Sequence, residues 1–261
     1  MARSIWNGTI AFGLMTVPVK LHTATESKTV SFREVHLDDG ARIEHRRFCS
    51  KEDKEVPYKE VVKGFEVRED EYVVLDKDEI AAAAGDGAHR IDVEHFVDVA
   101  DIDPVFFDRT YYLGAGEDGA QPYRLLRDAL AQTGRAGIGR FTFHDREYLT
   151  AVRERDGVLV LHTLRFADEL VPGSEIEVAK PGRGPGEREA KMAAALVDTL
   201  HTTFKAEDYD DEYRAAVLAV IERKRKGEEI VVADDDAGSD DAPDLMATLK
   251  ASLDGARKRG R

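Results

Sequence analysis

Short runs in which apolar and polar residues alternate fill the first two thirds of this chain. Alternation with a period of two is typical of β-strands that bury one face. One helical pattern interrupts the runs at 121–135, where Leu126 and Leu130 are four residues apart and Gly134 can end a helix. Many short strands with one helix predict a barrel or a sandwich. The predicted strands are 4–14, 17–21, 61–67, 71–75, 91–99, 110–113, 138–144, 147–154 and 158–166.

A long hairpin is predicted over 30–49, with "VSFREVHL" as its first arm, a turn at Asp38–Gly40 and "ARIEHRRFC" as its second arm. Alternation in the second arm places Arg42 and Arg46 on one face and His45 and Arg47 on the other. Neither face is uniformly apolar. We therefore expect this ribbon to project from the body of the protein instead of packing into a core.

The last third of the chain changes character after a loop rich in Pro and Gly at 168–189. From Glu187 to about Gly227, apolar residues such as Met192, Leu196 and Leu200 recur at helical spacing. This pattern predicts helices that either close the core or pack on a second subunit.

The end of the chain predicts an acidic linker followed by a short amphipathic helix. Residues 228–243 hold 7 Asp/Glu and no Lys or Arg. In 244–261, Asp244 is a candidate N-cap, and Leu245, Leu249 and Leu253 form a stripe spaced by four. Such a helix has little of its own to fold against, so it is expected to dock into the groove of a partner; a frayed tail is the alternative.

Charge is distributed unevenly along this acidic chain. The formal net charge is -14, yet residues 66–120 alone hold 16 Asp/Glu against 4 Lys/Arg. The stretch "GARIEHRRFCSKEDKE" at 40–55 is instead rich in cations. Because charges act locally and are screened beyond about 10 Å, the acidic total does not exclude a polyanionic partner.

No catalytic or cofactor-binding constellation is predicted. A literal GxGxxG at Gly114, Gly116 and Gly119 lies between a strand and a helix, but Glu117 and Asp118 within it would repel a pyrophosphate. A plain glycine-rich loop is the favoured interpretation. The aspartates at 101, 103 and 108 are interpreted as solvated loop charges, so no metal site is expected.

The chain carries no run of about 18 apolar residues that would span a membrane. Its first twenty residues predict a strand entering a sheet and not a signal peptide. Cys49 is the only cysteine, which excludes an internal disulfide and suits a reducing compartment. The expected location is therefore cytoplasmic.

The basic stretch is the strongest candidate site. Its cations lie on segments that are predicted to be extended, where they suit contacts to phosphates, which position a duplex without reading its sequence. Acidic residues are interleaved, so a solvated ribbon is the alternative. The cations are Arg42, Arg46, Arg47, Lys51 and Lys54 within the stretch and Lys59 and Lys63 shortly after it.

Several long, ordered segments resemble the bacterial Ku family of proteins that bind DNA ends. The resemblance runs from Ala2 to about Gly227. It is carried by "ARSIWNGTIAFGLMTVPVKL", "EVPYKEVVKGFEV" leading to "YVVL", "IDPVFFDRTYYL", "YRLLRDALAQTGRAGIGRF" and "LVLHTLRFADE".

The resemblance implies a mainly β fold with α: a β-barrel with long bridging arms, a C-terminal helical arm and a short flexible tail helix. Two subunits would close a ring around the DNA end and would recruit ligase D in non-homologous end joining. When bound to DNA, the protein would be nucleoid-associated. By segment, the bridge would place Arg33 beside the seven cations above as DNA contacts. The implied regions are a core over 1–170 with the bridge at about 28–75, a helical arm with dimer contacts over 171–227, a linker over 228–243 and a partner-binding end over 244–261.

Two other functions remain open at this stage. An abasic-site lyase would use a lysine near the DNA to form a Schiff base with the sugar. A protein-interaction scaffold without a nucleic-acid role would suit the acidic total. The resemblance favours a DNA-end clamp that is not an enzyme and that uses no cofactor.

Overall fold

The computed structural model describes residues 3–83, 89–143, 146–177, 186–228 and 245–259. By their internal contacts these residues divide into two units. The barrel unit holds residues 1–28 and 33–175, and the helical unit holds residues 29–32 and 176–261.

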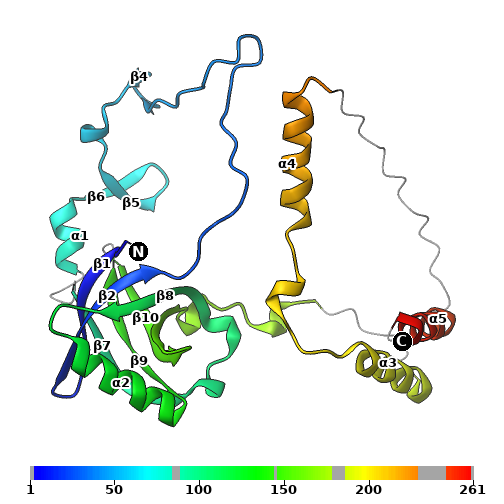
Figure 1. Ribbon diagram of the computed structural model, residues 1–261. Coiled ribbons are helices and arrows are strands. Elements are labelled where there is room, and N and C mark those ends of the chain that lie inside the picture. Colours follow the sequence, from blue (N-terminus) through cyan, green and yellow to red (C-terminus); the bar gives the residue numbers. More distant parts are fainter. Residues whose placement is uncertain (1–2, 84–88, 144–145, 178–185, 229–244, 260–261) are drawn as a thin grey trace. The chain divides into compact units, whose positions relative to one another are not determined.

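A closed barrel forms the centre of the first unit (Figure 1). Its strand order is β1-β2-β8-β11-β10-β9-β7; β1 and β7 pair in parallel, and the other neighbours are antiparallel. The predicted fold class, a β-barrel with helices, is thereby confirmed. The strands are β1 Trp6–Phe12, β2 Met15–Thr23, β7 Arg90–Asp98, β8 Phe107–Ala115, β9 Arg135–Phe143, β10 Arg146–Arg155 and β11 Val158–Leu164.

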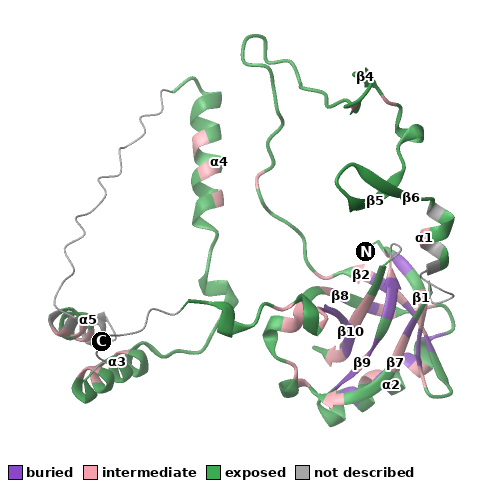
Figure 2. Cartoon of the chain, turned by 180° about the vertical axis from the view of Figure 1, so that it is seen from behind, coloured by how far each residue is buried: buried purple, intermediate pink, exposed green. Residues whose placement is uncertain are grey.

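Alternating side chains fill the barrel interior. In β2, Val17, Val19 and Leu21 are buried, while the residues between them are half-buried. Figure 2 shows buried residues concentrated in the barrel strands and along one side of α2, Ala120–Thr133. Full burial of each large aliphatic side chain stabilises the fold by about 1.5–3 kcal/mol. The main cluster comprises Trp6, Ile10, Val17, Val19, Leu21, Ile91, Tyr111, Leu113, Tyr123, Leu126, Leu130, Phe141, Val152, Leu159 and Leu161.

Helix α2 packs on this core through its predicted apolar side. The hydroxyl of buried Tyr123 donates to the Leu113 carbonyl at 2.6 Å and accepts from the Leu159 amide at 3.0 Å, so it ties the helix to β8 and β11. Burial raises the pKa of Tyr123. The helix ends at Gly134, which has a φ of 65°, a left-handed conformation that favours glycine.

The glycines of the GxGxxG segment serve packing inside the barrel unit. A Cβ at Gly116 would lie 2.9 Å from Pro18 atoms, and one at Gly119 would lie 2.7 Å from the Pro18 carbonyl oxygen. The Gly116 amide donates to that same carbonyl at 2.9 Å. These glycines therefore let the loop after β8 lie directly against β2, which agrees with a plain glycine-rich loop.

The buried side chain of His162 links three strands of the barrel. Arg153 Nε donates to His162 Nε2 at 3.0 Å, so Nδ1 carries the ring proton and donates to Thr110 Oγ1 at 2.9 Å. Burial, together with the charges of Arg153 and Arg155, lowers the pKa of His162 to about 4. The three strands β8, β10 and β11 are thus linked by a neutral imidazole.

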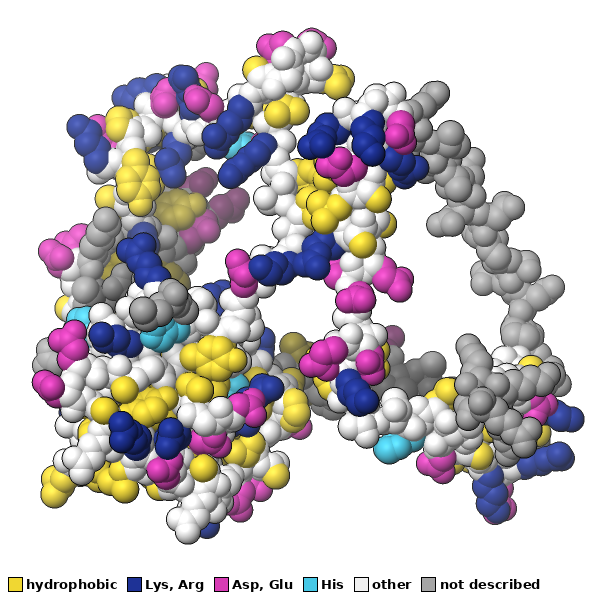
Figure 3. Space-filling model, viewed as in Figure 1, with side chains coloured by type: hydrophobic (Ala, Val, Ile, Leu, Met, Phe, Trp, Pro, Cys, Tyr) yellow, Lys and Arg dark blue, Asp and Glu magenta, His cyan; other side chains and the backbone are white. Residues whose placement is uncertain are grey.

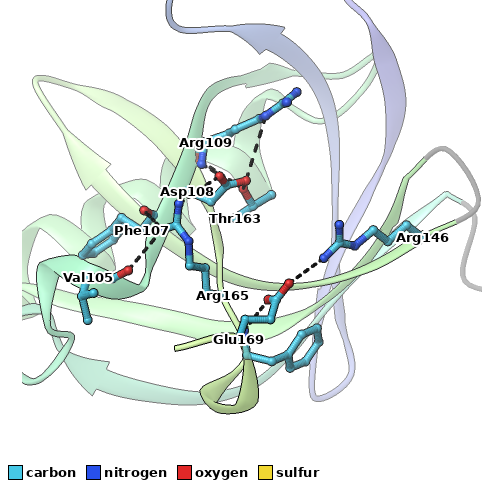
Figure 4. A network of polar contacts seen from close by, with 9 residues as sticks. Val105, Phe107, Asp108, Arg109, Arg146, Thr163, Arg165 and Glu169 are labelled. Carbon is cyan, nitrogen blue, oxygen red and sulfur yellow. Dashed lines mark hydrogen bonds and ion pairs between the residues drawn. The ribbon is translucent and has the colours of Figure 1, made fainter. Parts of the chain in front are cut away.

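A polar network fixes the chain where it leaves β11 (Figure 4). The guanidinium of Arg165 donates to the carbonyls of Val105 and Phe107 and pairs with Asp108 at 3.4 Å. Glu169 pairs with Arg146 at 2.9 Å and accepts from the Phe166 amide, which lowers the pKa of Glu169. The segment that leads towards the helical unit is therefore held on the barrel as far as Glu169.

Between β2 and β7 the chain makes a long excursion, which we call the arm (residues 28–75). It contains β3 Phe48–Cys49, β4 Lys54–Glu55, the 3₁₀ turn Tyr58–Glu60, β5 Lys63–Arg68 and β6 Glu71–Leu75, and it returns through α1, Lys77–Ala83 (Figure 1). Helix α1 is not among the predicted elements. Its start has a reciprocal cap that could have been found in "DKDE": Asp76 accepts from the Glu79 amide and Glu79 from the Asp76 amide.

The helical unit contains three described α-helices: α3 Glu187–Leu200, α4 Glu212–Arg225 and α5 Leu245–Arg259. Asp211 caps α4 by accepting from the Arg214 amide at 2.8 Å. The prediction of helices within 187–227 is confirmed; residues 201–211, between α3 and α4, are not α-helical. The predicted N-cap Asp244 and most of the acidic linker lie outside the described residues, and the region boundaries at 170 and 227 stay predictions.

Candidate nucleic-acid interface

The arm is exposed along its whole length. None of residues 28–75 is buried, and only Val30, Cys49 and Val56 are half-buried (Figure 2). Even its large apolar side chains, such as Phe32 and Phe65, are about two-thirds exposed, at 71% and 67%. A segment that buries so little within its own chain has surface available for a partner.

The predicted long hairpin of 30–49 is wrong in extent. Its turn is present, since the His36 and Gly40 amides donate to the Ala41 and His36 carbonyls, but only the single bridge Val35–Arg42 follows. Residues 43–47 form no strand, so the two-face assignment of Arg46 and Arg47 does not apply. The two sides of this predicted hairpin have no apolar face to bury. Nothing therefore stabilises a continuous ladder of hydrogen bonds between them.

A small hairpin, β3–β4, organises the centre of the arm. Phe48 pairs with Glu55 and Cys49 with Lys54, and the Val56 amide donates to the Arg47 carbonyl at 2.8 Å. Side chains close the same hairpin. Arg46 pairs with Glu55 at 3.2 Å, and the Arg47 guanidinium lies 5.0 Å from the centroid of the Tyr58 ring.

The structure separates the eight predicted DNA-binding cations into two groups. Arg46 and Lys54 are neutralised by Glu55 and Glu52, and Arg47 stacks on Tyr58. The others are exposed and form no ion pair with any described residue, so their charge is available to an anionic partner. These are Arg33, Arg42, Lys51, Lys59 and Lys63. Figure 3 shows Lys and Arg side chains along the arm with acidic side chains between them.

Hydrogen bonds to carboxylates order the turn between Arg33 and Arg42. His36 Nδ1 lies 3.0 Å from Asp39 Oδ1, which also accepts from the Ala41 amide at 2.9 Å. That amide and His36 lower the pKa of the Asp39 carboxyl. His45 Nε2 lies 2.7 Å from Glu34 Oε2, between the two segments that flank the turn. Arg42 therefore sits on a locally stabilised turn.

The end of the arm is a second hairpin, β5–β6, with an uncovered apolar face. Phe65 pairs with Val73 and Lys63 with Leu75, so these side chains lie on one side of the ribbon with Val67. All are exposed. A two-stranded hairpin is marginally stable at best in water. This face therefore needs a covering surface.

One concentration of positive charge was missed by the sequence analysis. Four consecutive cations, Arg223, Lys224, Arg225 and Lys226, end helix α4, and within them only Arg225 has a described ion pair, to Glu222 at 3.4 Å. The signal was present in "ERKRKG". Cations at this position also interact favourably with the carboxyl end of the helix dipole.

The tail helix, α5, packs against another helix of its own chain. Helix α5 packs on α3, and Leu253 lines a hollow together with Met192 and Ala195 of α3. Leu249 and Leu253 are half-buried, whereas the side chain of Leu245 lies outside the described residues. The expectation that this helix has little within its own chain to contact is therefore wrong.

Among the described residues, no three or more His, Cys, Asp or Glu side chains gather in a way that could hold a metal ion. Nor does any described helix combine the length and apolar character that a membrane crossing requires.

The fold and the arm together define a barrel protein with a long, exposed, cation-bearing insertion. Residues 11–203 match the family model described as the Ku70/Ku80 beta-barrel domain. The chain therefore belongs to the Ku family.

Curated relatives match over nearly the whole chain. The non-homologous end joining protein Ku of Anaeromyxobacter sp. (strain K) is 41% identical over 261 residues, which cover 100% of this chain and 88% of the relative. The protein of the same name from Bacillus subtilis (strain 168) is 32% identical, covering 99% and 84%. That of Archaeoglobus fulgidus is 35% identical, covering 98% and 100%.

Proposed function

We propose that this protein binds the ends of double-stranded DNA without regard to sequence, as a homodimeric ring, in non-homologous end joining. The observation that carries the proposal is the arm, which in a Ku barrel exposes five cations without an ion-pair partner among the described residues. Relatives at 32–41% identity are named as non-homologous end joining proteins.

Contact with DNA is assigned to the sugar-phosphate backbone. Arg33, Arg42, Lys51, Lys59 and Lys63 are distributed along the exposed arm, where cations are suited to contacts with phosphates. The arm presents no helix that could enter the major groove; within 28–75 its only helical element is one 3₁₀ turn. Affinity should therefore depend on salt and not on base sequence.

A second copy of the chain is the proposed covering surface for the apolar groups that this chain leaves exposed. The part of the β5–β6 face formed by Phe65, Val67 and Val73 is one such group; Lys63 lies outside it, in the end pair of the hairpin. Helix α4 is another: Tyr213 is 79% exposed and Leu218 is 48% exposed, and a lone helix of its length is marginal in water. Closing a ring from two copies would double the number of cations that face the DNA.

Recruitment of ligase D is proposed to use α5 through Leu245, Leu249 and Leu253. The three leucines lie at i, i+4 and i+8, a spacing that presents one apolar stripe to a groove. The charged residues of the same helix would remain at the rim.

Binding is favoured over lyase chemistry. A lysine that forms a Schiff base is activated by desolvation or by a neighbouring cation in a pocket. Lys51, Lys54, Lys59 and Lys63 are all exposed on the arm.

The test compares linear duplex with covalently closed circular duplex of the same sequence in a gel shift at moderate salt. Binding to the linear form alone, with equal affinity for unrelated sequences, is expected. Equal binding to both forms would mean lateral electrostatic association. Sedimentation of the free protein as a 29.0 kDa species, with and without DNA, would exclude the dimer.

A further inference from the structure

Helices α3 and α5 lie side by side in the helical unit (Figures 1 and 2). The contact brings together segments that are separated in sequence by α4 and the acidic linker. Leu253 of α5 and Met192 and Ala195 of α3 line the same hollow, together with Glu187, Arg188 and Lys191 of α3. The lining thus combines apolar and charged side chains.

Burial on both helices has the spacing of a helix–helix contact. On α3, Glu189, Met192 and Leu196 are half-buried, three and four residues apart, while Ala194 on the other side is exposed. On α5, Leu249 and Leu253 are half-buried, four residues apart, and Lys250 and Asp254 beside them are exposed. Each helix therefore covers the apolar stripe of the other.

The leucines that cover α3 are two of those assigned above to ligase D. One side of a helix cannot fill two grooves at once. Because α5 and α3 belong to the same chain, their association is intramolecular, so it depends on an effective concentration and not on the protein concentration. A contact of modest intrinsic strength can then keep α5 docked.

We propose that the α3 face formed by Glu189, Met192 and Leu196 is a docking surface for α5, and that this contact withholds Leu249 and Leu253 from an outside partner until α5 is released. The masking part rests on the proposed role of α5 in partner binding. If α5 is docked nine-tenths of the time, the apparent affinity of a partner for it is reduced about tenfold.

The docking is tested with full-length chains and a fluorescent peptide of residues 244–261, by fluorescence anisotropy. Leu249→Glu/Leu253→Glu undocks the chain's own α5, so this variant should bind the peptide at least about tenfold more tightly than the unsubstituted chain. Adding Met192→Glu should abolish that binding, and adding Ala194→Glu, on the exposed side of α3, should preserve it. Equal binding by the unsubstituted and undocked chains, or none by the undocked chain, would overturn the proposal.

Masking is tested separately with ligase D. Met192→Glu/Leu196→Glu frees α5 with its leucines intact, so ligase affinity should rise about tenfold relative to Ala194→Glu. Unchanged affinity would refute masking. The peptide assay contains neither DNA nor ligase, so its failure would leave the proposed end-binding function standing. Absence of ligase binding in every variant would refute the proposed role of α5 and the masking with it, while the docking of α5 on α3 would still be decided by the peptide assay.

Discussion

The guanidinium of Arg47 lies over the ring of Tyr58, 5.0 Å from its centroid, and this contact closes the β3–β4 hairpin from outside its two short strands. An exposed cation–π contact contributes about 0.5–1 kcal/mol. Tyr58→Ala should therefore loosen residues 46–58 and weaken DNA binding about two- to fivefold, because the hairpin must then be ordered on binding.

Tyr58→Phe keeps the ring and should bind DNA like the unsubstituted chain in the same titration. Hydrogen exchange at the Val56 amide, which donates to the Arg47 carbonyl, reports the hairpin directly and should accelerate only in the alanine variant. Unchanged affinity and exchange in Tyr58→Ala would show that the stacking does not order the arm.

The division of the arm cations into paired and unpaired groups predicts unequal effects on DNA binding. Arg42→Gln and Lys51→Gln remove charges that have no described ion-pair partner, whereas Lys54→Gln removes one that Glu52 already neutralises. The slope of log K against log salt is negative; each lost phosphate contact reduces its magnitude by about 0.9, and a homodimer loses two contacts per substitution. The magnitude should fall by about 2 for Arg42→Gln and by less for Lys54→Gln.

Titrations of a short duplex over a range of salt concentrations measure these slopes. The decrease should be the same for duplexes of unrelated sequence, because phosphate contacts carry no sequence information. A loss confined to one sequence would indicate base recognition, and equal slopes for Arg42→Gln and Lys54→Gln would refute the grouping.

His162 predicts an acid-sensitive barrel. The imidazole has a pKa of about 4 in the folded chain and about 6.5 when unfolded, so between these values the unfolded chain binds more protons. Its contribution to stability is present above pH 6.5 and is lost as the pH falls towards 4. The free energy of unfolding should fall by about 2 kcal/mol between pH 7 and pH 5 from this residue.

Urea denaturation at the two pH values measures this decrease. His162→Gln removes the titrating group and should flatten the dependence by that amount, whereas His201→Gln, at an exposed histidine, should leave it unchanged. An equally steep decrease in His162→Gln would assign the acid sensitivity to other groups.

The barrel was predictable in part because local patterns mark its strands and turns, although β11 is buried on both faces from Leu159 to Leu164. Alternation in β2 and the Asp156–Gly157 turn between β10 and β11, where both residues have positive φ, are local signals that agree with the tertiary fold. The stop of α2 at Gly134 is equally local. Strand order and closure are not local, and they entered through the resemblance to a family.

The arm and the tail were harder to predict, for physical reasons. Residues 43–47 alternate in polarity, yet no apolar face is buried there to select a strand. The sequence could name the arm cations but not show that Glu52 and Glu55 neutralise Lys54 and Arg46. The α3–α5 contact joins two stripes far apart in sequence, and each stripe by itself is also compatible with a partner's groove.

Encirclement of DNA by two arms is the central claim. The most direct measurement loads the protein on a linear duplex biotinylated at both ends, blocks the ends with streptavidin and then raises the salt concentration. A closed ring should remain on blocked DNA and leave unblocked DNA through its ends. Equal dissociation from blocked and unblocked duplex would show that the cations hold DNA from one side, without a ring.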